Sequence, residues 1–482
     1  MIARPATARS APRWGRQASF IAPRQPAFWL FCGLLAIGGL LFVEEQSVMA
    51  GLATAWLISW ALMLAYAVPV ALVIYRLDLF EREPKLMLAA ALAWGGVIAT
   101  SLATYANEAW LSVVGKLTSP DFAAQWGAAI VGPGVEETLK LMGVVALFLI
   151  ASSEVDGVLD GFVYGAMVGL GFTVVEDVSY FINAVAAVPG SVDQSGPVLD
   201  TFLVRVVAGG LYGHVLFAGL TGMGFAYLVT QRAAAMSRRV AVAVLCIAAG
   251  VSAHAVWNSP WMDSVLWTSG GASPSVQQWI EYGALKGLPF LILLAVLVTL
   301  ATRNEERDYR AIVAGEPDPM VVIESEIRSL GSLWLRWSAR AAAGRVGGRG
   351  AARLVGRLQA AQIEYAMIRS AADHLHDPAL EAQRLKIRSI RTQLGVGPMP
   401  PRPVGSVPSA PPAFGDRPWA PTHHVPPGGI AVWDAPRAAR HPVARISEGV
   451  ELAVVARTGA WAQVRDAAGR IGWVDGRLLI EG

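Results

Sequence analysis

Six polar side chains that could do chemistry lie inside strongly apolar stretches of this sequence: Glu136, Glu137, Glu176, His214, His254 and Asn258. An ionisable group inside a bilayer costs about 2.5–3.5 kcal/mol on insertion scales, so such a residue is a functional hypothesis by default. Hydrolysis of a peptide bond needs a nucleophilic water, a base that deprotonates it and charge that stabilises the oxyanion. Carboxylates, imidazoles and an amide can together meet these needs.

Two hydrolytic mechanisms are open to these side chains. In the first, His214 and His254 hold Zn²⁺ together with a carboxylate and leave an open position for water. In the second, a glutamate and a histidine activate the water directly, while His254 and Asn258 donate hydrogen bonds to the oxyanion. His254 and Asn258 are four residues apart, so a helix presents both on one face. Because the sequence has no His-Glu-x-x-His motif, a metal site would be assembled from separate helices.

The pair Glu136-Glu137 also has a structural interpretation. The preceding motif, residues 132–134 (Gly-Pro-Gly), predicts the start of a helix, because proline suits the first turn. The positive end of the helix dipole would then favour the ionised carboxylates. Lys140 follows at i+4 and i+3, so these residues could form an ion pair without any catalytic role.

The composition is that of a membrane protein with a different tail. The chain has 482 residues, of which 54% are hydrophobic and 16% charged, against roughly 25% charged in soluble domains. Residues 1–301 carry 15 Lys+Arg and 18 Asp+Glu, whereas residues 302–482 carry 24 and 18. These values exclude collagen-like, disulfide-rich secreted and wholly disordered proteins. Cys32 and Cys246 both lie in apolar runs and predict neither a disulfide framework nor a cysteine metal site.

Eight apolar runs approach the roughly 20 residues that a helix needs to cross a bilayer. They lie near residues 27–43, 50–75, 86–108, 131–151, 158–182, 202–229, 240–261 and 282–301. The first run is short and follows five arginines, so a signal sequence is the alternative there. Gly161, Gly165 and Gly169 form a small-residue ridge in the fifth run and predict close helix packing.

Arginine and lysine are concentrated in alternate loops, which predicts the orientation of the spans. The basic segments are the N-terminal tail, the loop with Arg76, Arg82 and Lys85, and the loop 230–239. Both termini are therefore expected in the cytoplasm, in a multi-pass protein of the inner (plasma) membrane. Counting 1.5 Å per residue from these loops places the carboxylates and imidazoles in one layer, about 5–18 Å below the outer surface.

The tail after the last span divides into three parts. Residues 302–396 predict an Arg-rich helical region, in which Trp334 and Trp337 could lie on the membrane surface or simply belong to a solvated helical pair. Residues 397–428 contain eleven prolines and predict an extended linker. Residues 429–482 alternate in short β-type runs with glycine turns, and their Gly and Trp pattern resembles bacterial SH3-type domains.

Several ordered motifs of the membrane part are similar to the PrsW family of intramembrane proteases, which is related to the CAAX-prenyl-protease and bacteriocin-processing group. They are the segments 80–85, 134–140, 160–172 and 254–258 together with Glu176-Asp177 and His214. The resemblance implies an integral-membrane peptidase with Glu136 or Glu137 as base and His214 and His254 as metal ligands or water activators. It adds Glu176 as a further ligand, followed here by Asp177 where many members have Asn. In the best-known members the substrate is an anti-sigma factor.

We therefore expect an all-α polytopic membrane bundle of about eight transmembrane helices, a cytoplasmic helical or disordered tail and a small all-β SH3-like barrel. The expected parts are a basic tail (1–26), a protease core (27–301), the helical region (302–396), the linker (397–428) and the SH3-like domain (429–482). The expected partners are a membrane-anchored protein substrate, lipid and a peptide or protein ligand of the SH3-like domain, with no nucleic acid. The alternatives are a proton-coupled transporter and a catalytically inert membrane scaffold.

Overall fold

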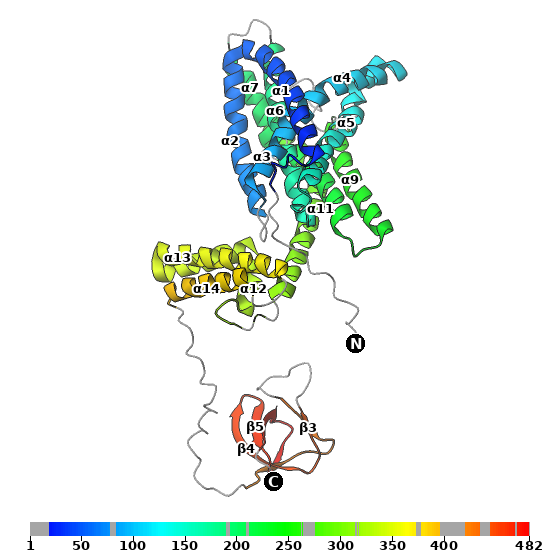
Figure 1. Cartoon of the computed structure of the whole chain (residues 1–482). Helices are drawn as coiled ribbons and strands as arrows, with labels where there is room; N and C mark the ends of the chain where they lie inside the picture. Colours follow the sequence, from blue (N-terminus) through cyan, green and yellow to red (C-terminus); the bar gives the residue numbers. More distant parts are fainter. Residues whose placement is uncertain are drawn as a thin grey trace, which may run out of the picture. The chain divides into compact units, whose positions relative to one another are not determined.

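The computed structural model describes residues 19–77, 83–188, 193–208, 212–261, 263, 275–313, 316, 318–372, 377–395, 420–433, 444–467 and 470–481. Two compact units make up the chain, Met1–Pro398 and Met399–Gly482 (Figure 1). Most of the basic N-terminal tail, the loop residues 78–82 and most of the proline-rich linker lie outside the described residues.

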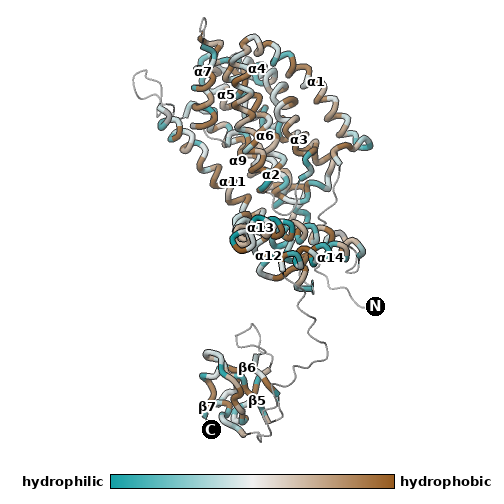
Figure 2. The backbone as a smooth tube through the Cα atoms, turned by 90° about the vertical axis from the view of Figure 1, so that its left-hand side faces the viewer, coloured by the Kyte–Doolittle hydropathy of each residue, from teal (hydrophilic) through white to brown (hydrophobic). Residues whose placement is uncertain are grey.

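The first unit is helical. Its membrane part contains α1 (Pro26–Met49), α2 (Ala53–Leu77), α3 (Lys85–Ala93), α4 (Thr100–Leu117), α5 (Pro120–Ile150), α6 (Val158–Ala186), α7 (Ser195–Phe202), α8 (Gly213–Thr230), α9 (Met236–Asn258) and α11 (Val276–Val313). Short one-turn segments join some of them: η1 (Ala50–Leu52) and the π-helical η2 (Trp94–Ala99) and η3 (Leu203–Ala208). Figure 2 shows hydrophobic residues along most of these helices.

Among the residues that the structure describes, six helical segments are long and apolar enough to cross a membrane, so the chain is a multi-pass membrane protein. They are Pro26–Leu77, Lys85–Leu117, Val158–Ala186, Gly213–Thr230, Met236–Asn258 and Gln277–Val313. The first of these segments folds back on itself at η1. The hydrogen bonds that Gln46 accepts from Trp56 Nε1 (2.8 Å) and Trp60 Nε1 (3.1 Å) show this. In a straight helix, residues 46 and 60 would be about 21 Å apart. The remaining apolar helix, α5, carries three charged residues in its middle.

Helix α6 is the centre of the bundle, and its glycine ridge sets the distance to α8. A Cβ atom built on Gly161 would lie 2.4 Å from the carbonyl oxygen of Gly222, one on Gly165 2.2 Å from that of Ala218, and one on Gly169 2.1 Å from that of His214. Only glycine permits this approach. The predicted close packing of the fifth apolar run is thereby confirmed, and it brings the backbone of His214 directly against α6.

The predicted start of the fourth span was wrong. Helix α5 begins at Pro120, where the Ser119 hydroxyl caps it by accepting from Phe122 N (3.1 Å), and it continues through Pro133. The Gly-Pro-Gly motif therefore lies inside the helix, where proline removes one backbone hydrogen bond without ending the helix. The two glutamates consequently lie midway along α5 and not at the positive end of its dipole.

The predicted sixth span, 202–229, is interrupted. Residues Leu203–Ala208 form a π-helical turn, and α8 starts anew at Gly213, whose φ of 23° lies outside the right-handed helical region. A glycine tolerates this backbone conformation at little cost. His214 therefore occupies the first turn of α8 instead of the interior of a longer span.

The helical region after the membrane part packs on the end of α11. Three further helices, α12 (Glu324–Leu330), α13 (Leu333–Ala371) and α14 (Pro378–Gln393), build this region. Its core includes Tyr309 and Val313 of α11 together with Leu330, Tyr365 and Leu380. Helix α13 contains non-helical backbone at Gly347 and Gly348, and there it folds back into two antiparallel halves, as the Gln359 Nε2 hydrogen bond to Arg336 O (3.2 Å) shows.

The second unit is a small β domain. Its strands are β1 (His423–His424), β2 (Ile430–Val432), β3 (Ala444–Ile446), β4 (Glu451–Thr458), β5 (Trp461–Arg465), β6 (Ile471–Asp475) and β7 (Ile480–Glu481). Five form an antiparallel sheet in the order β6-β5-β4-β1-β7, and β2 pairs with β3. Strand β1 lies within residues 397–428, the segment expected to be linker. Together the two units confirm the predicted fold class.

Candidate active site

Four helices bring their polar residues to one place in the membrane part. Helix α5 contributes Glu136, Glu137 and Lys140, α6 contributes Glu176, α8 contributes His214, and α9 contributes His254 and Asn258. The two glutamates, the lysine and both histidines are buried. The helices are far apart in sequence, so the site exists only in the folded bundle.

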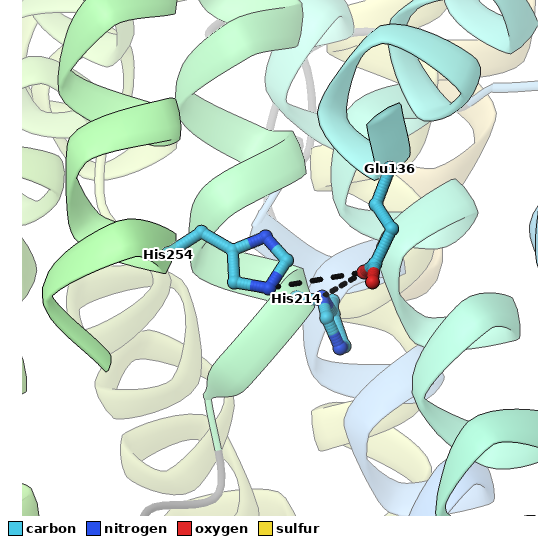
Figure 3. A group of neighbouring side chains, drawn as sticks. All are labelled: Glu136, His214 and His254. Carbon is cyan, nitrogen blue, oxygen red and sulfur yellow. Dashed lines mark ion pairs between the residues drawn. The ribbon is translucent and has the colours of Figure 1, made fainter. Parts of the chain in front are cut away.

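A metal-binding geometry is present at Glu136, His214 and His254 (Figure 3). One ligand atom from each residue lies within 4.8 Å of the other two. Glu136 Oε2 is 3.9 Å from His214 Nδ1 and 3.8 Å from His254 Nε2. Ligand atoms about 2.0–2.2 Å from a tetrahedral Zn²⁺ would be about 3.3 Å apart, so the three side chains would have to move closer together to bind the ion.

The other nitrogen of each imidazole faces a carboxylate. His254 Nδ1 is 3.0 Å from Glu137 Oε1, and His214 Nε2 is 2.8 Å from Glu176 Oε2. Histidines that bind metals usually donate their second N–H to such a carboxylate, which sets the tautomer and the ring orientation. Within the described residues, the carboxylate that lies next to both candidate ligand nitrogens is thus that of Glu136. The expected ligand Glu176 instead contacts the other nitrogen of His214.

Lys140 lies among these ligands. Its Nζ is 2.7 Å from His214 Nδ1, 3.2 Å from Glu136 Oε2 and 2.8 Å from Glu137 Oε1, and its side chain is fully buried. The expected ion pair with both glutamates is therefore present. The ammonium group also contacts the nitrogen and the oxygen that would bind a metal, so the site is built to hold positive charge.

Two aromatic rings restrict the imidazoles. Phe217 stacks on His254 with ring centroids 4.9 Å apart and an interplanar angle of 12°. Phe172 lies 4.8 Å from the ring of His214 and 3.9 Å from Lys140 Nζ. These contacts exclude water from two sides and leave the imidazoles little freedom to rotate.

Glu137 retains one unused oxygen. Its Oε1 atom faces Lys140 and His254, but the Oε2 atom is buried and has no hydrogen-bond partner among the described residues. A buried carboxylate oxygen without a partner is costly, and in native structures it often marks a catalytic role.

A pocket opens beside the imidazoles. His214, His254 and Asn258 line it together with Glu176 and Arg205. Asn258 Nδ2 donates to the carbonyl oxygen of Ala128 in α5 (3.2 Å). A Cβ on Gly132 would come within 3.3 Å of Glu136 Oε1 and 3.4 Å of Asn258 Nδ2, so this glycine leaves room between the two groups.

The residue after Glu176 has a different partner. Asp177 Oδ1 accepts a hydrogen bond from Arg205 Nε (2.8 Å), and Arg205 stacks 3.5 Å from the ring centroid of Tyr180. Arg205 Nη2 is 3.7 Å from Glu176 Oε2. Asp177 thus belongs to an ion pair in the pocket wall, while Glu176 contacts both Arg205 and His214.

Sequence reasoning missed two side chains at the site. Asn107 of α4 donates from Nδ2 to Glu136 Oε1 (3.0 Å) and so restrains this carboxylate. Its polar amide inside the third apolar run was a signal that could have identified it. Phe217, which stacks on His254, has no comparable signal, because a phenylalanine in an apolar helix is ordinary.

Comparison with known proteins identifies both parts of the chain. Residues 83–300 match the model of the PrsW family intramembrane metalloproteases, and residues 427–481 match that of the bacterial SH3 domain. No curated protein and no solved structure gave a significant match. Both resemblances noted in the sequence are confirmed, and the buried Glu/His group lies inside the first matched region. The chain therefore carries a PrsW family intramembrane metalloprotease domain, which makes it an intramembrane protease, followed by a bacterial SH3 domain.

Proposed function

We propose that this protease is a zinc-dependent endopeptidase that cleaves membrane-anchored proteins near the outer face of the inner membrane. The observation that carries the proposal is the convergence of Glu136, His214 and His254, with a carboxylate behind each imidazole. Glu136 replaces Glu176 as the third ligand of this proposal, because Glu176 contacts the His214 nitrogen that points away from the group. When bound, Zn²⁺ would act as a Lewis acid that polarises the scissile carbonyl and the attacking water.

Glu176 and Glu137 would orient the ligands. Each carboxylate accepts the N–H of one imidazole, so that His214 presents Nδ1 and His254 presents Nε2 to the metal. Lys140 Nζ lies 2.7 Å from His214 Nδ1. Binding of the metal would require the ammonium group to withdraw, since the metal and the ammonium group cannot both contact this nitrogen. The fit thus depends on a rearrangement of one side chain, while the backbone arrangement already suits the ligands.

Glu137 is the proposed general base. Its unpaired Oε2 would take a proton from the attacking water as the water oxygen bonds to the scissile carbonyl carbon. The same carboxyl would pass this proton to the amide nitrogen as the C–N bond breaks. Asn258 Nδ2, which lies on the pocket wall, would donate to the oxyanion. In the metal-free alternative, Glu137 and the histidines would activate the water without Zn²⁺.

The substrate proposal rests on topology. The loop charges favour a cytoplasmic position for both termini, and with them for the SH3 domain. We propose that the site lies nearer the outer surface than the inner one. A single-pass protein whose segment outside the membrane enters this site is the substrate class that fits, and an anti-sigma factor is an example that the family resemblance suggests. The SH3 domain would bind a peptide or protein ligand on the cytoplasmic side.

Metal content and cleavage measured together test the proposal. Wild-type protein purified in detergent should hold about one zinc per chain and cleave a membrane-anchored reporter substrate. His214→Ala and His254→Ala should lose both properties, whereas Glu137→Gln should keep the metal and lose cleavage.

A half-buried carboxylate outside the site provides a control variant. Glu45 of α1 contacts Ser179 Oγ (3.3 Å) away from the site, so Glu45→Gln should keep both metal and activity. Cleavage by metal-free protein would refute the zinc proposal and favour direct activation of water by Glu137 and histidine. Full activity of Glu137→Gln would refute the role of the base.

A further inference from the structure

The first half of α13 carries two large aromatic side chains that the protein does not cover. Trp334 is 68% exposed and Trp337 is 66% exposed. They are three residues apart in one helix, so they lie on the same face. Neighbouring exposed tryptophans on a well-formed helix indicate an interaction surface.

The opposite face of this half-helix packs against the protein. Arg336 Nε donates to Leu330 O (2.6 Å), and Arg340 Nε donates to Gln359 Oε1 (2.7 Å). At 100° per residue, Trp334, Trp337 and Arg345 lie within one stripe on the side that faces away from these contacts. The aromatic face is therefore an outer surface of the helical region.

Arg345 belongs to this stripe, and further exposed arginines lie in the neighbouring segments, Arg328 in α12 and Arg349, Arg353 and Arg357 after the bend of α13. None of these five arginines forms an ion pair or hydrogen bond within the part of the chain that the structure describes. Only one acidic residue, Glu364, occurs in α13. The surface therefore combines unneutralised positive charge with tryptophan, and its partner should be anionic with an apolar layer next to the charge.

The chain attaches this surface to the membrane at close range. Helix α11 has 38 residues and is about 57 Å long, whereas a bilayer core is about 30 Å thick. The charged end of α11 begins at Arg303, and Glu306 follows about one turn later. Gly331, just before α13, packs against Glu306, because a Cβ built on this glycine would lie 2.6 Å from Glu306 Cδ. Because α13 starts at Leu333, its first turns lie near the level at which α11 leaves the hydrocarbon.

We propose that the first half of α13 binds the anionic phospholipid surface of the membrane that α11 crosses. Trp334 and Trp337 insert at the boundary between headgroups and acyl chains, where indole rings are favoured. The arginines contact lipid phosphates. Exposed tryptophans next to the membrane exit of α11 favour lipid over nucleic acid, which would need charge but no insertion. This proposal is independent of the peptidase mechanism.

A depth-sensitive probe in the full-length protein tests the proposal. Ala341 lies within the tryptophan stripe, and Cys32 and Cys246 can be replaced, so a fluorophore can be attached to Ala341→Cys alone. In nanodiscs of phosphatidylcholine with 30% phosphatidylglycerol, doxyl-labelled lipid should quench the probe and iodide should not. The fraction of docked protein should fall in pure phosphatidylcholine and at high salt. A probe on Leu385→Cys in α14 should stay accessible to iodide.

Charge removal provides the matched comparison. Replacing Arg345, Arg349 and Arg353 with Gln should lower the docking equilibrium constant about 100-fold, at about fivefold per arginine. Lys386→Gln with Arg388→Gln should leave it unchanged, because these side chains already pair with Glu364 and Asp318.

The tryptophans give a second, independent variant. Trp334→Ser with Trp337→Ser should release the probe to iodide in phosphatidylglycerol, and both side chains are exposed, so folding should be preserved. Equal iodide quenching in both lipid compositions would overturn the proposal. Protection that appears only on addition of polyuridylate would overturn it as well, and would identify a nucleic-acid surface.

Discussion

Replacing Lys140 with methionine removes the ammonium group from the site and keeps an unbranched side chain that is one atom shorter. In the structure, Lys140 Nζ contacts Glu136, Glu137 and His214, and the lysine is fully buried. Breaking a buried ion pair by removal of one partner costs about 3–5 kcal/mol, because an uncompensated charge remains. For a domain of this size, the loss corresponds to a decrease in Tm of about 6–20 °C.

The same replacement should strengthen metal binding. The structure places Lys140 Nζ where a metal on His214 Nδ1 would lie, so the wild-type protein must displace an ammonium group when it binds Zn²⁺. The replacement destabilises the protein without metal by about 3–5 kcal/mol. If Lys140 does not stabilise the metal-bound protein, the variant binds the metal more tightly by this same free energy. The dissociation constant of Lys140→Met should then be between about 100-fold and a few thousand-fold lower.

Two measurements test this prediction. Chelator-treated protein is unfolded by heat in detergent, with and without Zn²⁺, and the affinity is measured by competition with a zinc-binding dye. Lys286→Met is the matched control, since Lys286 is also buried but donates to Trp257 O (3.2 Å), Ser259 O (2.6 Å) and the Tyr282 hydroxyl. It should lower stability without a comparable gain in affinity.

Equal Tm and equal zinc affinity for wild type and Lys140→Met would refute the reasoning. Lower affinity in the variant would mean that Lys140 supports the metal site instead of competing with the metal.

Three further predictions concern packing, the ligand carboxylate and the tail. Gly169→Ala would place a Cβ 2.1 Å from a backbone oxygen of α8, so peptidase activity should fall at least tenfold and the free energy of unfolding by about 1–3 kcal/mol. Gly134→Ala is the control and should be tolerated, because its Cβ meets nothing within 4 Å. Equal activity of Gly169→Ala and wild type would contradict the packing argument. Asn107→Leu removes the hydrogen bond to the ligand carboxylate and should reduce metal affinity or activity about 10–100-fold; unchanged values would exclude it from the site. Burial alone would raise the pKa of Glu316, but hydrogen bonds from Arg384 and a buried tyrosine lower it below its ordinary value of about 4.5. The ion pair of Glu316 with Arg384 therefore stabilises the tail at neutral pH, and this contribution is lost as the pH falls below about 4.5. Hydrogen-exchange protection of α14, corrected for intrinsic rates, should therefore fall on acidification in wild type but much less in Glu316→Gln.

Much of the fold could be predicted from composition and periodicity. Apolar runs located the membrane helices, and alternating residues with glycine turns predicted four β-strands that the structure contains, β2, β4, β5 and β6. These features depend on the local sequence, because each helix or strand exposes its own pattern to lipid or core.

Helix ends were harder to predict than helices. The Gly-Pro-Gly motif before Glu136 has the composition of a helix start, but Ser119 and Pro120 supply a better cap and the helix continues through Pro133. The break before His214 depends on the backbone angle of Gly213, which sequence composition does not determine. In the first case a capping signal earlier in the sequence outweighed the Gly-Pro-Gly motif.

The chemistry of the site divides in the same way. The sequence by itself indicated Glu136, Glu137, His214 and His254 as candidates, because charged and polar groups are costly in a membrane and each is therefore a functional hypothesis. Only the tertiary structure decided which atoms face one another: that Glu136 joins the two imidazoles, and that Glu176 lies behind His214. The physical reason is that these contacts depend on the rotation and depth of four separate helices. Contacts between distant segments, such as the glycine ridge of α6 against α8, set that rotation, and no local pattern encodes it.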